Sequence, residues 1–302
     1  MLGYEAPLYW GRNRMGAGMS AETEHELSLP VGTMRLSVSA ATDLGMVRRV
    51  NEDSYLAETG LYLVADGMGG HSFGDRASQS VVGTFASSLA DGGTLTPERV
   101  VQTIHSSNDV VVAMTDDDEE SVSGTTLAGL ALVQSETAHH WMAFNVGDSR
   151  VYSWDGRRLE QVTVDHSAVQ ELLDRGQITP IEATEHPHRN VVTRAIGVGD
   201  LVDPDIWLLP LAGSQLFLVC SDGLTKELGD DQIATILADR FRLPGDLTIA
   251  ERLVEAALAA GGSDNVTVVV VESELVGAAH SADEDTNDRG IPHHLENTRP
   301  RK

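Results

Sequence analysis

Four apolar runs in this chain each border an acidic residue, and this recurring arrangement constrains the fold more than any other feature. The first run, residues 61–65, ends at Asp66. The other three acids are Asp148 after residues 141–147, Asp222 after 215–220 and Ser221, and Asp264 just before 265–271. Short apolar runs are typical of buried strands. One acid at a strand end is often only a turn former, but four from distant strands predict a carboxylate cluster at one edge of a sheet.

Such a cluster favours a bound cation. Carboxylates held close together repel one another, and removal from water penalises their charged forms further. Ligands that are all oxygen favour Mg²⁺ or Mn²⁺ over Zn²⁺. The glycines at 67, 69 and 70 follow Asp66 and predict a turn where the backbone approaches a ligand closely. A backbone carbonyl beside Asp66 is therefore a further candidate ligand.

The composition is that of a soluble globular protein. The 302 residues are 41% hydrophobic and 22% charged, enough for one large domain or two modest ones. The formal net charge of -25 argues against nucleic acid or an anionic membrane surface as a constitutive partner. The single cysteine, Cys220, rules out an internal disulfide and fits a reducing compartment. We interpret it as a small buried strand residue.

The sequence also bears on location. It has no apolar stretch of 18 residues, so we expect no membrane span. Its N-terminus lacks the basic-then-apolar pattern of a secretory signal peptide. We therefore expect a cytoplasmic protein.

The order of periodic segments predicts an α+β fold with mainly antiparallel pairing. We expect strands near residues 34–41, 54–56, 61–65, 124–133, 141–146, 150–154, 159–164, 206–209, 215–220 and 265–271. We expect helices near 75–89, 96–114, 230–238 and 247–259 on the outside of two packed sheets. Residues 165–195 indicate a helical flap inserted between strands. Residues 1–33 show no clear period and predict a flexible extension, and 274–302 predict a disordered polar tail.

Six motifs occur in a fixed order along the chain. They are Gly-x-Val-Arg-x-x-Asn-Glu-Asp at 45–53, Asp-Gly-Met-Gly-Gly-His at 66–71, Gly-Thr-Thr at 124–126, Gly-Asp-Ser-Arg at 147–150, Ser-Asp-Gly-Leu at 221–224 and Asp-Asn at 264–265. Together they resemble the metal-dependent protein phosphatases, the type 2C serine/threonine phosphatases, and the bacterial branch in particular. The resemblance spans residues 34–273, which we expect to form the catalytic domain. It implies a four-layer α-β-β-α sandwich of two mainly antiparallel sheets flanked by helix pairs.

The resemblance also implies a centre of two metal ions, with a third seen in bacterial members. The residues that match its ligand positions are Glu52, Asp53, Asp66, Gly67, Asp148, Asp222 and Asp264. Asp66 would bridge both ions, and Asp222 and Asp264 would complete the shell of one. The Gly67 carbonyl, and Glu52 through water, would serve the other. Asp53 would lie in the surrounding shell, and Asp148 with Asp222 would hold the third ion.

The implied reaction is hydrolysis of phosphoserine and phosphothreonine in proteins. Arg48 would bind the substrate phosphate, because a guanidinium fork suits its equatorial oxygens. A hydroxide bridging the Mn²⁺ or Mg²⁺ ions would attack directly, so that no phospho-enzyme forms. By family analogy the substrates would be proteins phosphorylated by eukaryotic-type Ser/Thr kinases. We expect a monomer.

Other residues of these motifs carry separate expectations. Met68 stands where eukaryotic relatives have a histidine proposed as general acid, and a thioether cannot donate a proton. His71 or a metal-bound water remain alternatives for that step. Thr125 and Thr126 are expected to serve strand packing, and Arg150 to make a structural ion pair near Asp148.

Two other functions remain open. A pseudophosphatase would use the same fold as a binding module without turnover and predicts lost metal carboxylates, whereas Asp66, Asp222, Asp264 and Glu52 are all present. A narrow regulator that dephosphorylates one anti-sigma-type antagonist protein would usually carry a sensor domain, and the sequence indicates none.

Overall fold

The computed structural model describes residues 19–69, 73–90, 92–115, 124–136, 138–240 and 246–277. Its strands form two sheets in which neighbouring strands are antiparallel. Sheet A has the order β1 (Met19–Leu29), β2 (Gly32–Asp43), β12 (Val266–Val276), β11 (Ser214–Cys220), β8 (Arg150–Trp154), β9 (Leu159–Gln161). Sheet B has the order β10 (Asp205–Pro210), β7 (Ala138–Val146), β6 (Leu127–Ser135), β4 (Leu61–Met68), β3 (Asp53–Glu58), with β5 (Gly124–Thr125) paired to β4.

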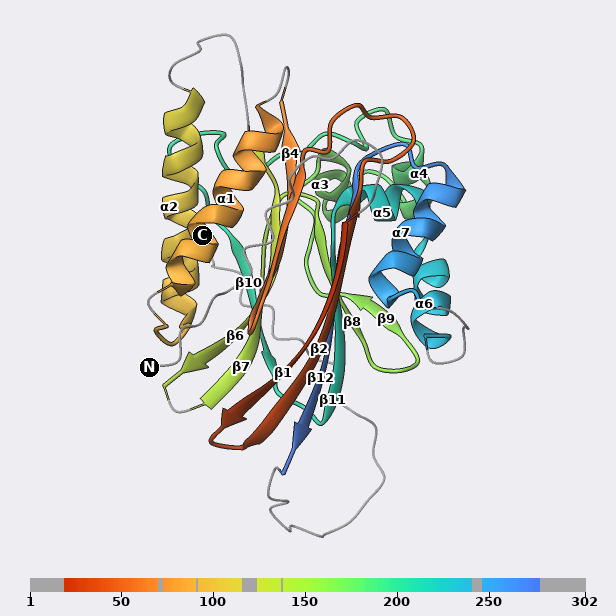
Figure 1. Cartoon of the computed structure of the whole chain (residues 1–302). Coiled ribbons are helices and arrows are strands. Elements are labelled where there is room, and N and C mark those ends of the chain that lie inside the picture. The colour runs from red at the N-terminus through yellow and green to blue at the C-terminus, as the bar shows by residue number, and fades with distance from the viewer. Residues whose placement is uncertain are drawn as a thin grey trace.

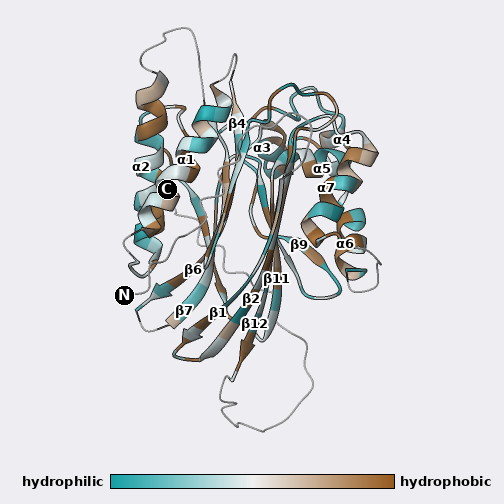
Figure 2. Cartoon of the chain, in the orientation of Figure 1, coloured by the Kyte–Doolittle hydropathy of each residue, from teal (hydrophilic) through white to brown (hydrophobic). Residues whose placement is uncertain are grey.

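Helices cover the outer face of each sheet, as Figure 1 shows. On sheet B lie α1 (Gly74–Leu89) and α2 (Pro97–Thr115), and on sheet A lie α5 (Asp222–Glu227), α6 (Asp230–Ala238) and α7 (Ile249–Ala260). Apolar residues along one side of α1 and of α7 are buried against the sheets. Figure 2 shows hydrophobic and hydrophilic residues interspersed along these helices. The predicted α+β fold with four α-β-β-α layers is therefore confirmed.

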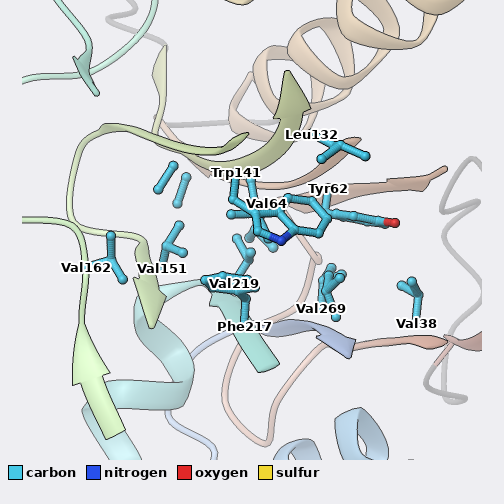
Figure 3. Close-up of a cluster of buried hydrophobic side chains, with 14 of the residues drawn as sticks. Val38, Tyr62, Val64, Leu132, Trp141, Val151, Val162, Phe217, Val219 and Val269 are labelled. Carbon is cyan, nitrogen blue, oxygen red and sulfur yellow. The ribbon is translucent and has the colours of Figure 1, made fainter. Parts of the chain in front are cut away.

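Large apolar side chains from both sheets meet between them (Figure 3). The rings of Trp141 from β7 and Phe217 from β11 have centroids 5.6 Å apart, and Tyr62 from β4 packs on the same Trp141 at 6.4 Å. Cys220 is buried on the other face of sheet A, under its helices, as expected for a packing residue. This core fixes the two sheets relative to each other, and thus the strand ends that carry the acidic residues.

Residues 19–29 form strand β1, paired with β2 from Met19 opposite Thr42 to Leu29 opposite Gly32. The predicted flexible extension over residues 1–33 is wrong for this part, and residues 1–18 lie outside the described residues. The segment alternates, with Glu22, Glu24 and Glu26 exposed and the residues between them half-buried. The period was missed because most inward positions are Ala, Thr or His, and only Leu27 and Leu29 reach the inter-sheet core.

The flap and the C-terminal segment complete the chain. Residues 165–195 contain two short helices, α3 (Ala168–Asp174) and α4 (Pro180–Thr184). Ser167 caps α3, and a capping box between Thr179 and Glu182 starts α4. Strand β12 runs to Val276, five residues beyond the predicted end. The predicted disordered tail over 274–302 is therefore wrong for residues 274–276, and from 278 onward it lies outside the described residues. Among the described helices, none has the length and apolar character needed to cross a membrane.

Candidate metal centre

Acidic residues from both sheets meet at one end of the sandwich. Asp53 and Asp66 are directly opposite each other in the β3–β4 register. Asp222 begins helix α5 two residues after β11, and Asp264 lies two residues before β12. Because β11 and β12 are hydrogen-bonded neighbours, their connections place Asp222 and Asp264 side by side. The carboxyl groups of Asp66 and Asp222 then interact across the gap between the sheets.

The Gly-Thr-Thr motif holds the backbone of Asp66. The Asp66 amide donates to Thr126 Oγ1 at 3.0 Å, and the Asp66 carbonyl accepts from the Thr126 amide and from Thr125 Oγ1, both at 2.9 Å. Thr126 Oγ1 also bonds Ser149 Oγ at 2.7 Å. These threonines were expected to serve strand packing alone, but their hydroxyl groups also fix the position of the central acid.

Asp53 is buried and tied to the opposite sheet. Its Oδ2 accepts a hydrogen bond from Ser221 Oγ at 2.8 Å, and Ser221 Oγ accepts from the Thr267 amide at 2.9 Å. Asp53 Oδ1 has no hydrogen-bond partner among the described residues, although it is shielded from solvent. A buried carboxylate oxygen without a partner is costly, unless a cation or a proton satisfies it.

Lys226 lies between Asp222 and Asp264, the acids next to the neighbouring strands β11 and β12. Lys226 Nζ is 2.6 Å from Asp222 Oδ2 and 2.7 Å from Asp264 Oδ2. Asp222 Oδ1 is buried and lacks a partner within the described part of the chain. The i,i+4 spacing on α5 brings Lys226 over Asp222.

Arg48 approaches the same centre from the loop after β2. It contacts Asp264 with both ends of its guanidinium fork, Nε to Oδ1 and Nη2 to Oδ2, each at 2.8 Å. Its side chain is 47% exposed. Arg48 therefore lies at the mouth of the acidic cluster and remains accessible to a ligand from solvent.

Asn265 holds the loop that carries Arg48 and Glu52. Its Nδ2 donates to the carbonyls of Leu44 at 2.9 Å and Val50 at 3.0 Å, and its Oδ1 accepts from the Glu52 amide at 2.9 Å. One side chain thus closes both ends of the loop. Asn265 belongs to the Asp-Asn motif, but it was not assigned a role from sequence.

Glycine is required where the backbones approach most closely. A Cβ on Gly67 would collide with the carbonyls of Gly74 and Glu52, and a Cβ on Gly223 would collide with the carbonyl of Asn265. The Gly67 amide in turn donates to the Glu52 carbonyl at 3.2 Å. The glycine after Asp66 thus lets backbone segments pack closely and brings Gly67 beside Glu52, while the predicted close approach to a ligand stays a prediction.

Asp148 lies at the junction between the centre and the flap. The adjacent Gly147 amide donates to His166 Nδ1 at 3.0 Å, and His166 Nε2 is 3.4 Å from Asp205 Oδ2. Arg150 forms a bidentate pair with Asp165, with Nη2 2.7 Å from Oδ2 and Nε 2.9 Å from Oδ1. Arg150 thus makes the expected structural ion pair, with the first residue of the flap as its partner.

Burial and mutual repulsion dominate the electrostatics of this cluster. Burial raises the pKa of Asp66, and the charges of Asp53, Asp222 and Asp148 raise it further. Burial likewise raises the pKa of Asp53 and of Asp148 to about 7, and it raises the pKa of Asp222. Burial alone would raise the pKa of Asp264 too, but Lys226 and Arg48 lower it overall. The protein therefore holds several acids that an additional cation would stabilise.

The donor set fits a hard divalent ion. The acidic side chains that converge here offer carboxylate oxygens, the ligand type that Mg²⁺ and Mn²⁺ prefer. Two of their buried oxygens, Asp53 Oδ1 and Asp222 Oδ1, have no partner among the described residues. No three acidic, histidine or cysteine side chains of the described ranges stand together as an assembled cage. Asp264 instead contacts Arg48 and Lys226, and Asp222 contacts Lys226.

The eight site residues expected from sequence all lie at this end of the molecule. Those in the centre are Asp53, Asp66 and Asp222, with Asp264, Arg48, Glu52, Gly67 and Asp148 around them. Sequence reasoning missed Lys226, Ser221 and Asn265 as contacts. His71, one alternative for the general acid, lies outside the described residues.

Comparisons with known proteins agree with this architecture. A family model described as protein phosphatase 2C matches residues 48–258. The serine/threonine protein phosphatase PstP of Mycobacterium tuberculosis is 36% identical over 243 residues, which are 80% of this chain and 45% of that protein. The chain thus spans less than half of PstP. The serine/threonine phosphatase stp of Listeria monocytogenes is 34% identical over 252 residues, covering 80% of this chain and 97% of stp.

Solved structures are similar over the same region. The crystal structure of the Mycobacterium tuberculosis phosphatase PstP superposes with a TM-score of 0.70 at 36% identity, covering 80% of this chain and 98% of that one. The catalytic domain of PstP in complex with two manganese ions gives a TM-score of 0.68 at 33% identity, covering 80% and 99%. With its fold, its acidic centre and these relatives in agreement, the chain belongs to the protein phosphatase 2C family.

Proposed function

We propose that this protein is a Mn²⁺- or Mg²⁺-dependent phosphatase of phosphoserine and phosphothreonine in proteins. The observation that carries the proposal is the meeting of Asp53, Asp66 and Asp222, buried carboxylates from two sheets, beside the exposed guanidinium of Arg48. Acids that raise one another's pKa favour divalent cations, and the guanidinium favours a phosphate. The chain's similarity to serine/threonine phosphatases, one of them solved with two manganese ions, supports the same assignment.

The metal would be held by the residues gathered at the sheet ends. Asp66 would be shared by two ions, Asp222 and Asp264 would serve one of them, and the Gly67 carbonyl and Glu52 would serve the other. Burial and the charge of Asp222 raise the pKa of Asp148. Asp148 would help hold a third ion. When bound, divalent ions supply a nucleophile from water near neutral pH and neutralise charge on the phosphate. Asp53, hydrogen-bonded to Ser221, would orient the surrounding carboxylates.

Arg48 would bind the phosphate of the substrate. Two of its five N–H donors contact Asp264, and the remaining N–H groups of this 47% exposed side chain would donate to phosphate oxygens. Asn265 fixes the loop that carries Arg48, which reduces the entropy lost on binding. Arg48 would thus position the phosphorus for attack from the metal side.

The partners would be phosphorylated proteins, and we propose targets of eukaryotic-type Ser/Thr kinases. The flap at 165–195 lies beside Asp148 and would contact the substrate chain. We further propose that the protein acts as a monomer in the cytoplasm. Light scattering of the purified protein tests the monomer, since a dimer doubles the scattering mass.

The test is hydrolysis of matched phosphoserine, phosphothreonine and phosphotyrosine peptides with Mn²⁺, with Mg²⁺ and with chelator. The proposal expects turnover of the first two peptides that requires metal and stops with chelator. Equal turnover with chelator would contradict the metal centre. A folded protein that binds Mn²⁺ but does not release phosphate would be a pseudophosphatase.

A further inference from the structure

Lys226 is chemically unusual in this chain. The sequence contains two lysines, Lys226 and Lys302, and its other strongly basic residues are all arginines. Lys226 lies in the acidic centre with its Nζ 2.6 Å from Asp222 Oδ2 and 2.7 Å from Asp264 Oδ2. Its side chain is 27% exposed, so a path to solvent is open. An ammonium thus bridges two of the carboxylates that the proposed metal centre needs.

The carboxylate of Asp264 has no acceptor capacity left. Its Oδ1 accepts from Arg48 Nε at 2.8 Å and from the Asn265 amide at 2.9 Å. Its Oδ2 accepts from Arg48 Nη2 at 2.8 Å and from Lys226 Nζ at 2.7 Å. A carboxylate offers about four lone-pair sites, and four donors occupy them. A metal ion can therefore bind Asp264 only after a donor leaves.

Of these donors, Lys226 is the one suited to leave. The Asn265 amide belongs to the backbone, and Arg48 holds two points of a rigid fork. Lys226 makes one contact to Asp264, on a flexible four-carbon stem. It also contacts Asp222, which Arg48 does not. One movement of Lys226 would therefore release an oxygen on each of two acids.

We propose that Lys226 is a built-in competitor of the metal: its ammonium joins Asp222 to Asp264 in the metal-free protein and is displaced when a divalent ion binds both. The inference rests on the metal centre of the proposed function. Its consequence is a centre that is stable without metal but binds metal less tightly. An opposite role, a lysine that stays in place and supports the ligands of the bound metal, predicts the reverse effect on affinity.

Calorimetric titration of metal-free protein with Mn²⁺ tests the proposal. Lys226→Met keeps the stem and removes the charge, and we expect its Kd for Mn²⁺ to be about tenfold tighter, since a charge-assisted competitor is lost. Lys226→Arg keeps the charge and should bind Mn²⁺ no more tightly than the wild type. Arg35→Met is the matched control, because it removes an equal charge at an exposed ion pair with Glu26, away from the centre. Its Kd should equal the wild-type value.

Thermal unfolding in chelator is the second readout. Lys226→Met should lower the Tm of the metal-free protein more than Arg35→Met does, because two acids lose their shared cation. An unchanged or weaker Mn²⁺ affinity in Lys226→Met overturns the proposal that Lys226 competes with the metal. Absence of Mn²⁺ binding by the wild-type protein overturns the metal centre itself, so the two failures are distinguishable.

A measurement on the unmutated protein remains valid if Lys226→Met does not fold. Selective ¹³C labelling of lysine ε-carbons gives two signals, because the chain has two lysines. Titration with diamagnetic Mg²⁺ should shift and sharpen the Lys226 signal as its side chain is released. A Lys226 signal that neither shifts nor sharpens while calorimetry shows Mg²⁺ binding overturns the proposal.

Discussion

Ser221 Oγ donates a hydrogen bond of 2.8 Å to Asp53 Oδ2, across 168 residues of sequence. The bond joins the start of β3 in sheet B to the residue that links β11 to α5 in sheet A. It therefore fixes the separation of the two sheets at the acidic centre.

Ser221→Ala should destabilise the protein by about 1–3 kcal/mol, since it leaves buried Asp53 with one partner fewer. It also removes the acceptor of the Thr267 amide. Chemical denaturation measures the change. Ser87→Ala is the matched control, because the exposed Ser87 hydroxyl donates to the Gly83 carbonyl of its own helix. A loss of unfolding free energy equal to that of Ser87→Ala would mean that the Ser221–Asp53 bond does not stabilise the protein.

Arg48→Lys should lower kcat/KM for a phosphoserine peptide roughly 10- to 100-fold, the value of a lost charge-assisted hydrogen bond. A lysine keeps the charge but cannot bind two oxygens in a plane. The neighbouring Arg49→Lys is the control and should change kcat/KM little. Steady-state kinetics measure kcat/KM for both variants. Equal losses of kcat/KM would contradict a specific role of Arg48 in phosphate binding.

Arg150→Met should destabilise the protein by about 3 kcal/mol, because it leaves Asp165 as an uncompensated, largely buried charge. Arg150 also donates to Tyr152 Oη at 2.9 Å. The exposed Arg157, in the turn between β8 and β9, provides Arg157→Met as a control of equal charge. The denaturant midpoints of the two variants are compared. A small shift for Arg150→Met would mean that the Arg150–Asp165 pair does not stabilise the flap.

The stabilising effect of Asp205 should depend on pH. His166, whose Nε2 is 3.4 Å from Asp205 Oδ2, and Arg194 lower the pKa of Asp205 from 3.8 to about 2, against the effect of burial. A lowered carboxyl pKa contributes stability above the unfolded pKa, and that stability is lost as pH falls from about 4 toward 2. Asp205→Asn should therefore cost up to about 1 kcal/mol at pH 7, a small value for a partly exposed group.

Unfolding between pH 3 and pH 7 checks this dependence. The difference between wild type and Asp205→Asn should narrow toward pH 3. A difference that stays constant with pH would mean that Asp205 does not titrate with a lowered pKa.

The site could be predicted from the sequence where strand ends fix the side chains. Asp66, Asp222 and Asp264 each border a strong apolar run, so the sheets that bury those runs also gather the acids. The helices were equally clear, since their apolar stripes face one sheet; the predicted 230–238 coincides with α6.

Contacts between distant segments could not be predicted in the same way. Lys226 and Asp264 are 38 residues apart, and no local pattern relates them. The scarcity of lysine was the one available signal. Strand β1 was missed for another reason, because its inward residues are mostly small or polar, and its pairing depends on the long partner β2.

Asp66→Asn tests the central claim most directly, because this residue lies between the two sets of acids. Calorimetry with Mn²⁺ and hydrolysis of a phosphoserine peptide are measured on the same folded sample, with the far-ultraviolet circular dichroism compared to wild type. The account predicts that Mn²⁺ affinity and kcat/KM both fall by more than about 100-fold while the fold is retained. Hydrolysis at the wild-type rate by the folded variant would contradict it.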